Sequence, residues 1–247
     1  MGTCYGHSQV GTSGINGDMF FISPDNTTLL LSDGASGAGK SGKVVMSNHC
    51  AQTIQAHPFS TSGLTPREYL DKMIWKINND LIDISQKSKV YTFGTLVICV
   101  VHQHRATIAS VGDSPAYLIS QQGIQRVAQT HKTYQNLVDF GLLTAAQAEE
   151  NVQKLHPYMH SMFDVFLPMV VPVYAVEAVD IAAGDMIVLC CDGVSDHVKP
   201  KEIMEMLNRD NLHSGMETIF STAKARAIAD KNAHQYDDIT MVVYVSE

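Results

Sequence analysis

Residues 29–41 read Leu-Leu-Leu-Ser-Asp-Gly-Ala-Ser-Gly-Ala-Gly-Lys-Ser, an apolar run followed by a loop rich in glycine and serine. From Gly34 to Ser41 the loop fits the pattern GxxxxGK(S/T), which cradles phosphate between a strand and a helix in nucleotide hydrolases. Begun one residue earlier, the same loop is a strand that ends in Asp33-Gly34, which places a carboxylate at the strand end. These two interpretations predict different folds, and the surrounding sequence has to distinguish them.

The segments on either side of this loop predict a β-hairpin before it and two helices after it. Apolar runs at residues 18–23 and 28–32 are joined by Pro24-Asp25-Asn26, which is typical of a turn. Apolar residues recur at helical spacing over residues 41–56 and 65–86, and Thr65-Pro66 is a suitable start for the second helix.

The rest of the chain predicts strands in blocks and helices in pairs. Short links between the next four strands favour antiparallel pairing in meanders. Residues 128–170 are polar and rich in histidine, and we interpret them as an inserted flap. Strands are expected over residues 93–101, 106–111, 116–120, 124–127, 170–176, 186–191 and 239–245, and a helix pair over residues 200–208 and 215–229.

This order of elements predicts an α+β fold, a four-layer αββα sandwich of two antiparallel sheets flanked by helix pairs. A nucleotide hydrolase with the GxxxxGK(S/T) loop needs a parallel sheet built from repeated βαβ units. Because the middle of the chain strings four strands together without a helix, the order of elements disfavours a P-loop at Gly34 to Ser41.

The composition is that of one folded domain. Of the 247 residues, 45% are hydrophobic and 17% are charged, which is too apolar for a disordered chain. The net charge of -8 argues against nucleic-acid binding as the main activity. No stretch has the apolar length of a membrane span, the N-terminal residues lack the features of a signal peptide, and the five cysteines form no CxxC pair. We therefore expect a cytoplasmic protein that binds neither nucleic acid nor membrane.

Three aspartates mark the ends of apolar strands. Asp33 and Asp192 each follow such a run, and Asp237 stands just before the closing strand. Carboxylates brought together would repel one another unless cations lay between them. Oxygen ligands suit magnesium or manganese rather than zinc. The pattern predicts a divalent metal site, provided that the three strand ends meet in space.

Further segments join these aspartates, and their order along the chain resembles that of the metal-dependent protein phosphatases of type 2C, the PPM family. The resemblance spans nearly the whole chain, so it implies one phosphatase domain over residues 1–247 with residues 128–170 as its flap. The segments that carry it are Asn16-Gly17-Asp18, Asp33-Gly34, Gly94-Thr95, Val111–Tyr117, Thr130-His131-Lys132, Gly141–Thr144, His156-Pro157, Asp192-Gly193 with Asp196, and Asp237-Asp238-Ile239-Thr240.

The resemblance implies hydrolysis of phosphoserine and phosphothreonine in proteins by a water or hydroxide that bridges two Mn²⁺ or Mg²⁺ ions. Asp33 would bridge the two ions. The carbonyl of Gly34 would bind one ion, and Asp192 and Asp237 would bind the other. Asp33, Asp192 and Asp237 are therefore the implied catalytic residues, and no protein nucleophile is required.

Other positions of the family site are auxiliary or altered in this chain. Asp18 would support the metal cluster through water, and Asp113 would help to bind a third, weaker ion, although a turn residue is an equal interpretation of Asp113. The family's phosphate-clamping arginine falls at Ser13, its acidic neighbour of Asp18 is Gly17, and the histidine that follows Asp-Gly in many eukaryotic members is Ala35. The phosphate-binding side of the site is therefore the part that departs most from the family.

Lys40 and Lys43 are candidates to replace the missing arginine, and solvated lysines at a helix start are the alternative interpretation. Gly17–Phe21 and the loop after Asp33 resemble the sporulation and stress-response branch, whose substrates are phosphoserines in anti-sigma-factor antagonists. The flap resembles the bacterial branch that opposes Ser/Thr kinases. A pseudo-phosphatase that binds phosphoprotein without turnover is a further alternative, because Ser13 and Gly17 weaken the site.

Overall fold

The computed structural model describes residues 2–35, 39–90, 92, 94–128, 144, 174–229 and 235–247, with only the backbone at residues 39, 40 and 210. Its strands form two five-stranded sheets in which all neighbouring strands are antiparallel. The first sheet contains, in spatial order, β1 (Thr3–Gln9), β10 (Ile239–Val245), β9 (Met186–Cys190), β6 (Ala116–Ser120) and β7 (Gly123–Arg126). The second contains β2 (Met19–Ile22), β3 (Thr28–Gly34), β4 (Gly94–His102), β5 (Arg105–Val111) and β8 (Ala175–Asp180).

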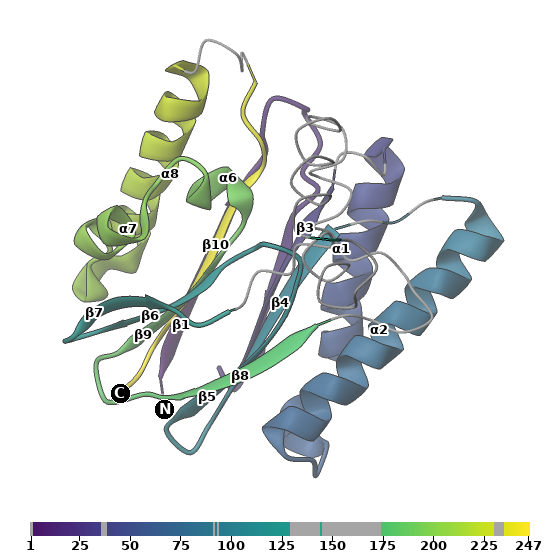
Figure 1. Cartoon of the computed structure of the whole chain (residues 1–247), viewed down its shortest axis with the longest axis horizontal. Helices are drawn as coiled ribbons and strands as arrows, with labels where there is room; N and C mark the ends of the chain where they lie inside the picture. Colours follow the sequence, from purple (N-terminus) through teal and green to yellow (C-terminus); the bar gives the residue numbers. More distant parts are fainter. Residues whose placement is uncertain are drawn as a thin grey trace.

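Helices cover the outer face of each sheet. The long helices α1 and α2 pack on the second sheet, whereas α7 and α8 pack on the first. Figure 1 shows the resulting order of four layers, with the two sheets face to face between the two helix pairs. The bounds are α1 (Gly39–Ala56), α2 (Pro66–Ser88), α6 (Asp192–Ser195), α7 (Pro200–Met206) and α8 (Leu212–Ala229), with short 3₁₀ turns at Phe59–Thr61 and Arg209–Asn211. The predicted αββα sandwich is confirmed, and none of the described helices is long and apolar enough to cross a membrane.

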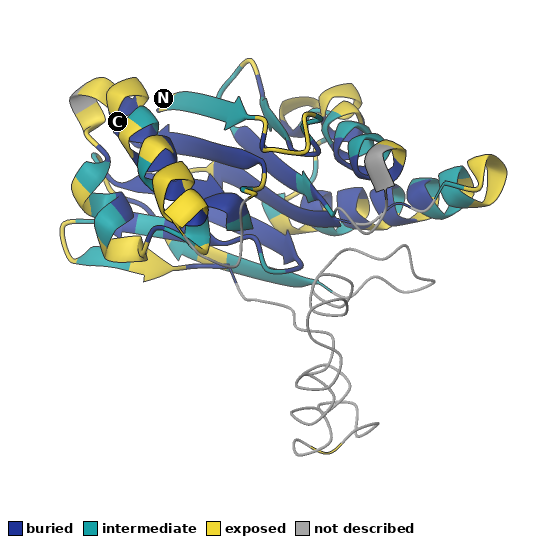
Figure 2. Ribbon diagram, turned by 90° about the horizontal axis from the view of Figure 1, so that it is seen from above, coloured by how far each residue is buried: buried dark blue, intermediate teal, exposed yellow. Residues whose placement is uncertain are grey.

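The central strands of the second sheet are apolar on both faces because both faces are covered. Leu29 and Leu31 of β3 pack into the core between the sheets, while Leu30 packs against the core beneath α1 and α2. Successive side chains of a strand point to opposite faces, so a strand buried on both sides is a continuous apolar run rather than an alternating one. Figure 2 shows where the described residues are buried, with most buried residues in the sheets and exposed residues on the outer helix faces.

Helix α2 begins and ends where its sequence signals indicate. The hydroxyl of Thr65 accepts a hydrogen bond from the backbone of Glu68, whose carboxylate accepts one from the backbone of Thr65, and Pro66 occupies the first helical position. Such a capping box satisfies amide groups that have no partner within the helix. The helix ends at Ser88, and the following cap residue, Lys89, adopts the left-handed conformation. The helix predicted over residues 65–86 is therefore confirmed.

The four strands after α2 form two antiparallel pairs, as predicted, but the prediction of one continuous meander is wrong. Strands β4 and β5 pair within the second sheet, whereas β6 and β7 pair within the first. The link Gly112-Asp113-Ser114-Pro115 therefore crosses from one sheet to the other. Its backbone then joins the first sheet, since the amide of Cys190 in β9 donates to the carbonyl of Pro115. Apolar alternation identifies a strand, but it does not identify the sheet to which the strand belongs.

Two strands differ from the sequence prediction. Strand β1 was not expected, because residues 1–17 are rich in glycine, serine and threonine; it is a partly buried edge strand that pairs with β10. Strand β8 covers Ala175–Asp180 and so runs beyond the predicted end at residue 176, while residues 170–173 of that prediction lie outside the described residues; its partly exposed edge position admits polar residues. Of the flap predicted over residues 128–170, the structure describes only residues 128 and 144, so this prediction lies outside the described residues.

Candidate metal centre

Four aspartates meet at one end of the sandwich because of strand direction. Asp18 stands just before β2 and Asp33 lies near the end of its antiparallel neighbour β3, so both lie at the same edge of the second sheet. Asp192 directly follows Cys191 beyond β9, and Asp237 precedes the antiparallel strand β10, so these two lie at one edge of the first sheet. Packing of β3 against β9 and β10 brings the two edges together.

The four carboxyl groups are close enough to perturb one another. Asp33 interacts with Asp18, Asp237 and Asp192, and Asp192 interacts with Asp33, Asp237 and Asp113. Burial, followed by the neighbouring negative charges, raises the pKa of Asp33 and of Asp192 well above the ordinary range. Clustered acids with raised pKa values are typical of a site that holds a positively charged group.

The pKa of Asp18 is raised to about 7, chiefly by burial; a hydrogen bond from Thr240 lowers it, and the charges of Asp238 and Asp192 raise it. That bond runs from the Thr240 hydroxyl to Oδ2 of Asp18 over 2.7 Å. Asp18 is buried, whereas Asp33 and Asp192 keep partial exposure, as an ion or a substrate would require. The site therefore combines a buried, oriented acid with two accessible ones.

Two carboxylate oxygens fit a cation. Oδ1 of Asp18 and Oδ1 of Asp192 are buried and have no hydrogen-bond partner among the described residues. A buried acceptor without a partner costs about 1–3 kcal/mol, and more when it is charged, so a cation between these groups would remove a considerable penalty. The ligand atoms of Asp33, Cys191 and Asp192 lie within 4.8 Å of one another, which is suitable for one ion.

The thiol of Cys191 makes two hydrogen bonds to the backbone. Its Sγ accepts a hydrogen bond from the amide of Thr240 at 3.1 Å and donates to the carbonyl of Asp238 at 3.4 Å. Burial raises the pKa of Cys191 well above its usual value, so it remains a neutral thiol. The available donors are then oxygens, which suit Mg²⁺ or Mn²⁺.

The comparison with protein families agrees with this arrangement. A family model described as protein phosphatase 2C matches residues 5–233, which include Asp18, Asp33, Asp113 and Asp192. The chain belongs to the protein phosphatase 2C family. Membership confirms the resemblance and the predicted enzyme class, protein serine/threonine phosphatase.

Bacterial members of the protein phosphatase 2C family are similar over most of the chain. Serine/threonine phosphatase stp of Listeria monocytogenes is 24% identical over 217 residues, which cover 84% of this chain and 82% of that protein. The serine/threonine phosphatase PstP/Ppp of Mycobacterium tuberculosis superposes with a TM-score of 0.78 at 21% identity, covering 100% of this chain and 99% of the other. The catalytic domain of PstP in complex with two manganese ions superposes with a TM-score of 0.74 at 20% identity, covering 99% and 97%. At these identities the structural matches establish the fold.

Family membership and the antiparallel sheets together disfavour the nucleotide-hydrolase interpretation of Gly34 to Ser41. Strand β3, which precedes the loop, is paired antiparallel with both β2 and β4. A P-loop needs a parallel sheet at this point. Gly34 is the last residue of β3, where its amide donates to the carbonyl of Gly17 at 3.2 Å. The side chain of Lys40, predicted as a substrate contact, lies outside the described residues.

The structure brings most of the predicted site residues of this phosphatase together. Asp113 lies in the link between the sheets, close enough for its charge to act on Asp192, and its carbonyl accepts a hydrogen bond from Arg126 at 3.0 Å. Sequence reasoning missed the importance of Asp238 and misjudged Lys43, which is a buried partner of Asp238 rather than a solvated lysine. No local pattern could have joined them, because they lie 195 residues apart.

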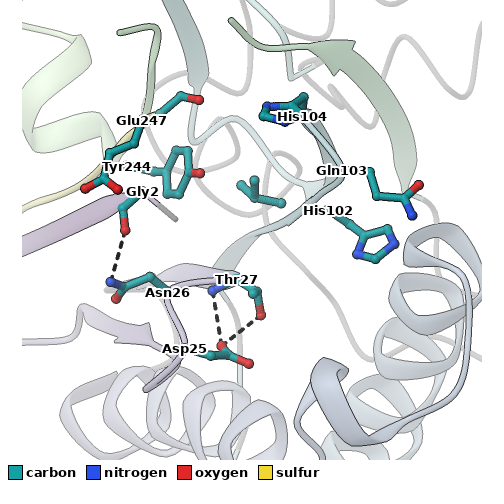
Figure 3. A pocket seen from close by; sticks show the side chains of 11 residues that line it. Gly2, Asp25, Asn26, Thr27, His102, Gln103, His104, Tyr244 and Glu247 are labelled. Atoms are coloured by element: carbon teal, nitrogen blue, oxygen red, sulfur yellow. Dashed lines mark hydrogen bonds between the residues drawn. The ribbon is translucent and has the colours of Figure 1, made fainter. Parts of the chain in front are cut away.

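A hollow lies at the end of the sandwich opposite the metal centre, between the β2–β3 turn, the β4–β5 turn and the end of β10. Its volume is about 290 Å³, and Asp25, His102, His104 and Tyr244 are among its lining residues (Figure 3). The two histidines point in different directions, and Asp25 accepts hydrogen bonds from Thr27 (Figure 3). Asp25 also accepts one from the hydroxyl of Ser23. Gln103 and His104 form the turn between β4 and β5, and the hollow takes no part in the metal centre.

The raised pKa of Asp18 predicts an unusual pH dependence of stability in the metal-free protein. Between the unfolded pKa of 3.8 and the folded value of about 7, the folded state binds more protons than the unfolded state. The contribution of Asp18 to stability is therefore fully present below the unfolded pKa, and it is lost as the pH rises through the folded pKa. Urea unfolding in EDTA at about pH 5 and about pH 7 is expected to give a lower free energy of unfolding at the higher pH.

Asp18→Asn is the control for this prediction, because the neutral amide cannot titrate. The variant is expected to show a flatter dependence over the same window, and saturating Mn²⁺ is expected to stabilise the wild type most at the higher pH, where the acids bind it without releasing protons. A wild-type stability that rises with pH in EDTA would show that Asp18 is ionised in the folded protein at low pH, contrary to its burial.

Proposed function

We propose that this chain hydrolyses phosphoserine and phosphothreonine in proteins with the help of two divalent ions, Mn²⁺ or Mg²⁺. The observation that carries the proposal is the meeting of four carboxyl groups, two from each sheet, with buried oxygens that lack partners. The fold match to a PstP domain that binds two manganese ions supports the same number of ions here. The negative charge of this end of the molecule would be neutralised by such a pair.

The proposed ligands are divided between the sheets. Asp33 interacts with Asp18 on its own sheet and with Asp192 and Asp237 of the other, which suits it to bind both ions. The carbonyl of Gly34 would be a ligand of one ion, and Asp192 and Asp237 would be ligands of the other. When bound, the two ions supply a nucleophile from water at neutral pH and neutralise charge on the phosphoryl group.

The surrounding side chains orient these ligands. The Thr240 hydroxyl fixes one oxygen of Asp18, and the amide of Asp238 donates to Oδ1 of Asp237 at 2.8 Å. Hydrogen bonds of this kind hold a carboxylate in position before an ion arrives. Asp113, whose charge acts on Asp192, is the candidate for a third and weaker ion.

The proposed substrates are phosphorylated proteins. Targets of a Ser/Thr kinase and anti-sigma-factor antagonists are both candidates, and Lys40 is a proposed contact for the substrate phosphate. We propose no nucleic-acid or membrane partner, in line with the net charge of -8. The single domain with a flap over residues 128–170 belongs to the same proposal, as does a cytoplasmic location, which suits five cysteines that are all unpaired.

Metal-dependent hydrolysis tests the proposal directly. The purified protein is expected to hydrolyse an aryl phosphate and a phosphothreonine peptide when Mn²⁺ is present, and to lose this activity when EDTA is in excess. ATP, offered at the same concentration, is expected to be a poor substrate, because the sheets do not form a nucleotide-binding fold.

Each alternative has its own signature in this assay. Preferred hydrolysis of ATP would favour the nucleotide-hydrolase interpretation. Binding of the phosphopeptide without turnover, measured by fluorescence anisotropy, would favour a pseudo-phosphatase. Turnover that persists in excess EDTA would contradict a metal-dependent reaction.

A further inference from the structure

Lys43 is buried beside the metal centre. It lies near the start of α1, and its side chain is only 5% exposed. Its Nζ donates to Oδ2 of Asp238 at 2.9 Å and to Oγ of Ser13 at 3.3 Å. The carboxylate of Asp238 is 3% exposed, so both charges of the pair are removed from water. Lysine is almost never buried to this extent unless it is paired, so the burial of Lys43 depends on Asp238.

Asp238 connects Lys43 to the loop that leads into β2. Its Oδ1 accepts a hydrogen bond from the amide of Gly11 at 2.7 Å, and its Oδ2 accepts one from the amide of Gly17 at 2.7 Å. The carboxylate thus joins helix α1, the loop of residues 11–17 and the segment before β10. Asp18 follows Gly17 and Asp237 precedes Asp238, so two proposed metal ligands lie next to the joined segments.

Gly17 leaves space for the side chain of Lys43. A Cβ at position 17 would lie 2.6 Å from Cδ of Lys43, 3.0 Å from its Cε and 2.9 Å from the carbonyl oxygen of Gly34. Any side chain here would displace the lysine or the end of β3. The carbonyl of Gly17 accepts a hydrogen bond from the amide of Gly34, so the side chain of Lys43, the loop of residues 11–17 and the end of β3 are packed together.

The burial of Lys43 decides between two roles. A lysine that binds a substrate phosphate has to present its ammonium group to solvent. The ammonium of Lys43 is instead enclosed and faces a carboxylate, which would compete with any phosphate. A buried ion pair of this kind contributes mainly by fixing the geometry around it. The pair is therefore suited to position the neighbouring ligands rather than to touch the substrate.

We propose that Lys43 is a positioning residue for the metal centre. Its ion pair with Asp238 holds the loop of residues 11–17 against α1 and β3, and thereby places Asp18 and the carbonyl of Gly34 for the ions. The inference rests on the proposed two-metal function, and it adds a residue that acts through other residues.

Lys43→Met tests the proposal, because methionine keeps most of the apolar stem and removes the charge. Mn²⁺ affinity, measured by calorimetry at a temperature where circular dichroism shows the variant to be folded, is expected to fall by about tenfold or more. Lys43→Arg, which keeps the charge, is expected to retain more of the affinity. Lys87→Met is the matched control, because Lys87 pairs with Asp83 on the exposed side of α2 with 78% of its side chain exposed. This control is expected to bind Mn²⁺ like the wild type.

Lys43→Met leaves the carboxylate of Asp238 buried without its cation, so this variant could fail to fold. The double variant Lys43→Met with Asp238→Asn removes both charges and is expected to melt at a higher temperature than the single variant, with Mn²⁺ affinity still reduced. If the single variant is unfolded, the double variant takes its place in the metal titration.

Two results would overturn the proposal. Unchanged Mn²⁺ affinity in the folded variants, with only a lower melting temperature, would make the pair a purely structural feature. A raised KM for an aryl phosphate, with kcat and Mn²⁺ affinity unchanged, would make Lys43 a direct substrate contact. Metal binding is measured without turnover, so an inactive wild type that binds Mn²⁺ would contradict the proposed function alone.

Discussion

Replacement of Asp33 by asparagine is expected to lower the Mn²⁺-dependent phosphatase rate by at least about 10²–10³-fold while the protein stays folded. Asp33 interacts with acids of both sheets, namely Asp18 on its own sheet and Asp192 and Asp237 on the other. The amide of asparagine is a weaker ligand and carries no charge to balance two dications. Single-turnover assays with a phosphothreonine peptide measure the loss, and calorimetry shows how much of it is lost metal binding.

The same substitution is expected to stabilise the protein when metal is absent. Burial and the neighbouring acids hold the pKa of Asp33 well above its usual range, which means that its charged form is unfavourable in the folded state. The neutral amide of the Asp33→Asn variant would remove that repulsion, so the melting temperature in EDTA is expected to rise as the activity falls. Sites that sacrifice stability for function show this opposition.

Two further variants show whether the effect is specific to Asp33. Asp83→Asn, on the exposed side of α2, is expected to change neither activity nor stability appreciably, because exposed ion pairs contribute little. Asp113→Asn is expected to have a much smaller effect on activity than Asp33→Asn if it serves only a third, weaker ion. Full activity of Asp33→Asn, or a lower melting temperature in EDTA, would mean that this carboxylate does not belong to the metal centre.

Gly193→Ala is expected to destabilise the protein and to remove metal binding, although alanine is the better helix former. A Cβ at Gly193 would lie 2.1 Å from the carbonyl oxygen of Asp238, a backbone atom that cannot move without displacing the strand that follows. Inserting a methyl group into such a space costs about 1–3 kcal/mol. In the absence of this contact, alanine in a helix would instead stabilise by up to about 1 kcal/mol.

The sign of the change in the free energy of unfolding therefore tests whether Gly193 packs against the backbone of Asp238. Urea unfolding measures it, and Gly63→Ala is the control, because its Cβ would meet no atom within 4 Å and only its φ of 68° opposes the change. That backbone strain is expected to cost roughly 1–2 kcal/mol without affecting Mn²⁺ binding. A Gly193→Ala variant that is more stable than the wild type, with intact metal affinity, would show that Asp192 and Asp237 are not held by this close approach.

The positions of the strand ends could be predicted from the sequence, but the way in which the strands meet could not. Buried strands are predicted by the apolar runs Leu29 to Leu31 and Ile187 to Leu189. The aspartates that follow these runs could be assigned to strand ends from the sequence alone. Local patterns do not report which sheet a strand joins, so the crossing at residues 112–115 was missed. The partly buried strand β1 was missed because its polar residues hide the pattern.

The candidate site shows the same limit at the level of side chains. The three main aspartates could be proposed from their places in the chain. The burial of Lys43, its pairing with Asp238 and the space left by Gly17 depend on contacts between residues far apart in sequence. Solvent exposure decides whether a lysine binds substrate or supports its neighbours, and exposure is a property of the fold.

The division of the proposed ligands between the two sheets has a consequence for biosynthesis. Asp237 comes with β10, which is made after every other described strand and then pairs between β1 and β9. A chain still emerging from the ribosome can form the β2–β3 hairpin early, yet it lacks Asp237, the last of the proposed ligands. Catalytic competence should therefore appear in a single late step, when β10 is inserted, and shorter nascent chains should not dephosphorylate the proteins around them.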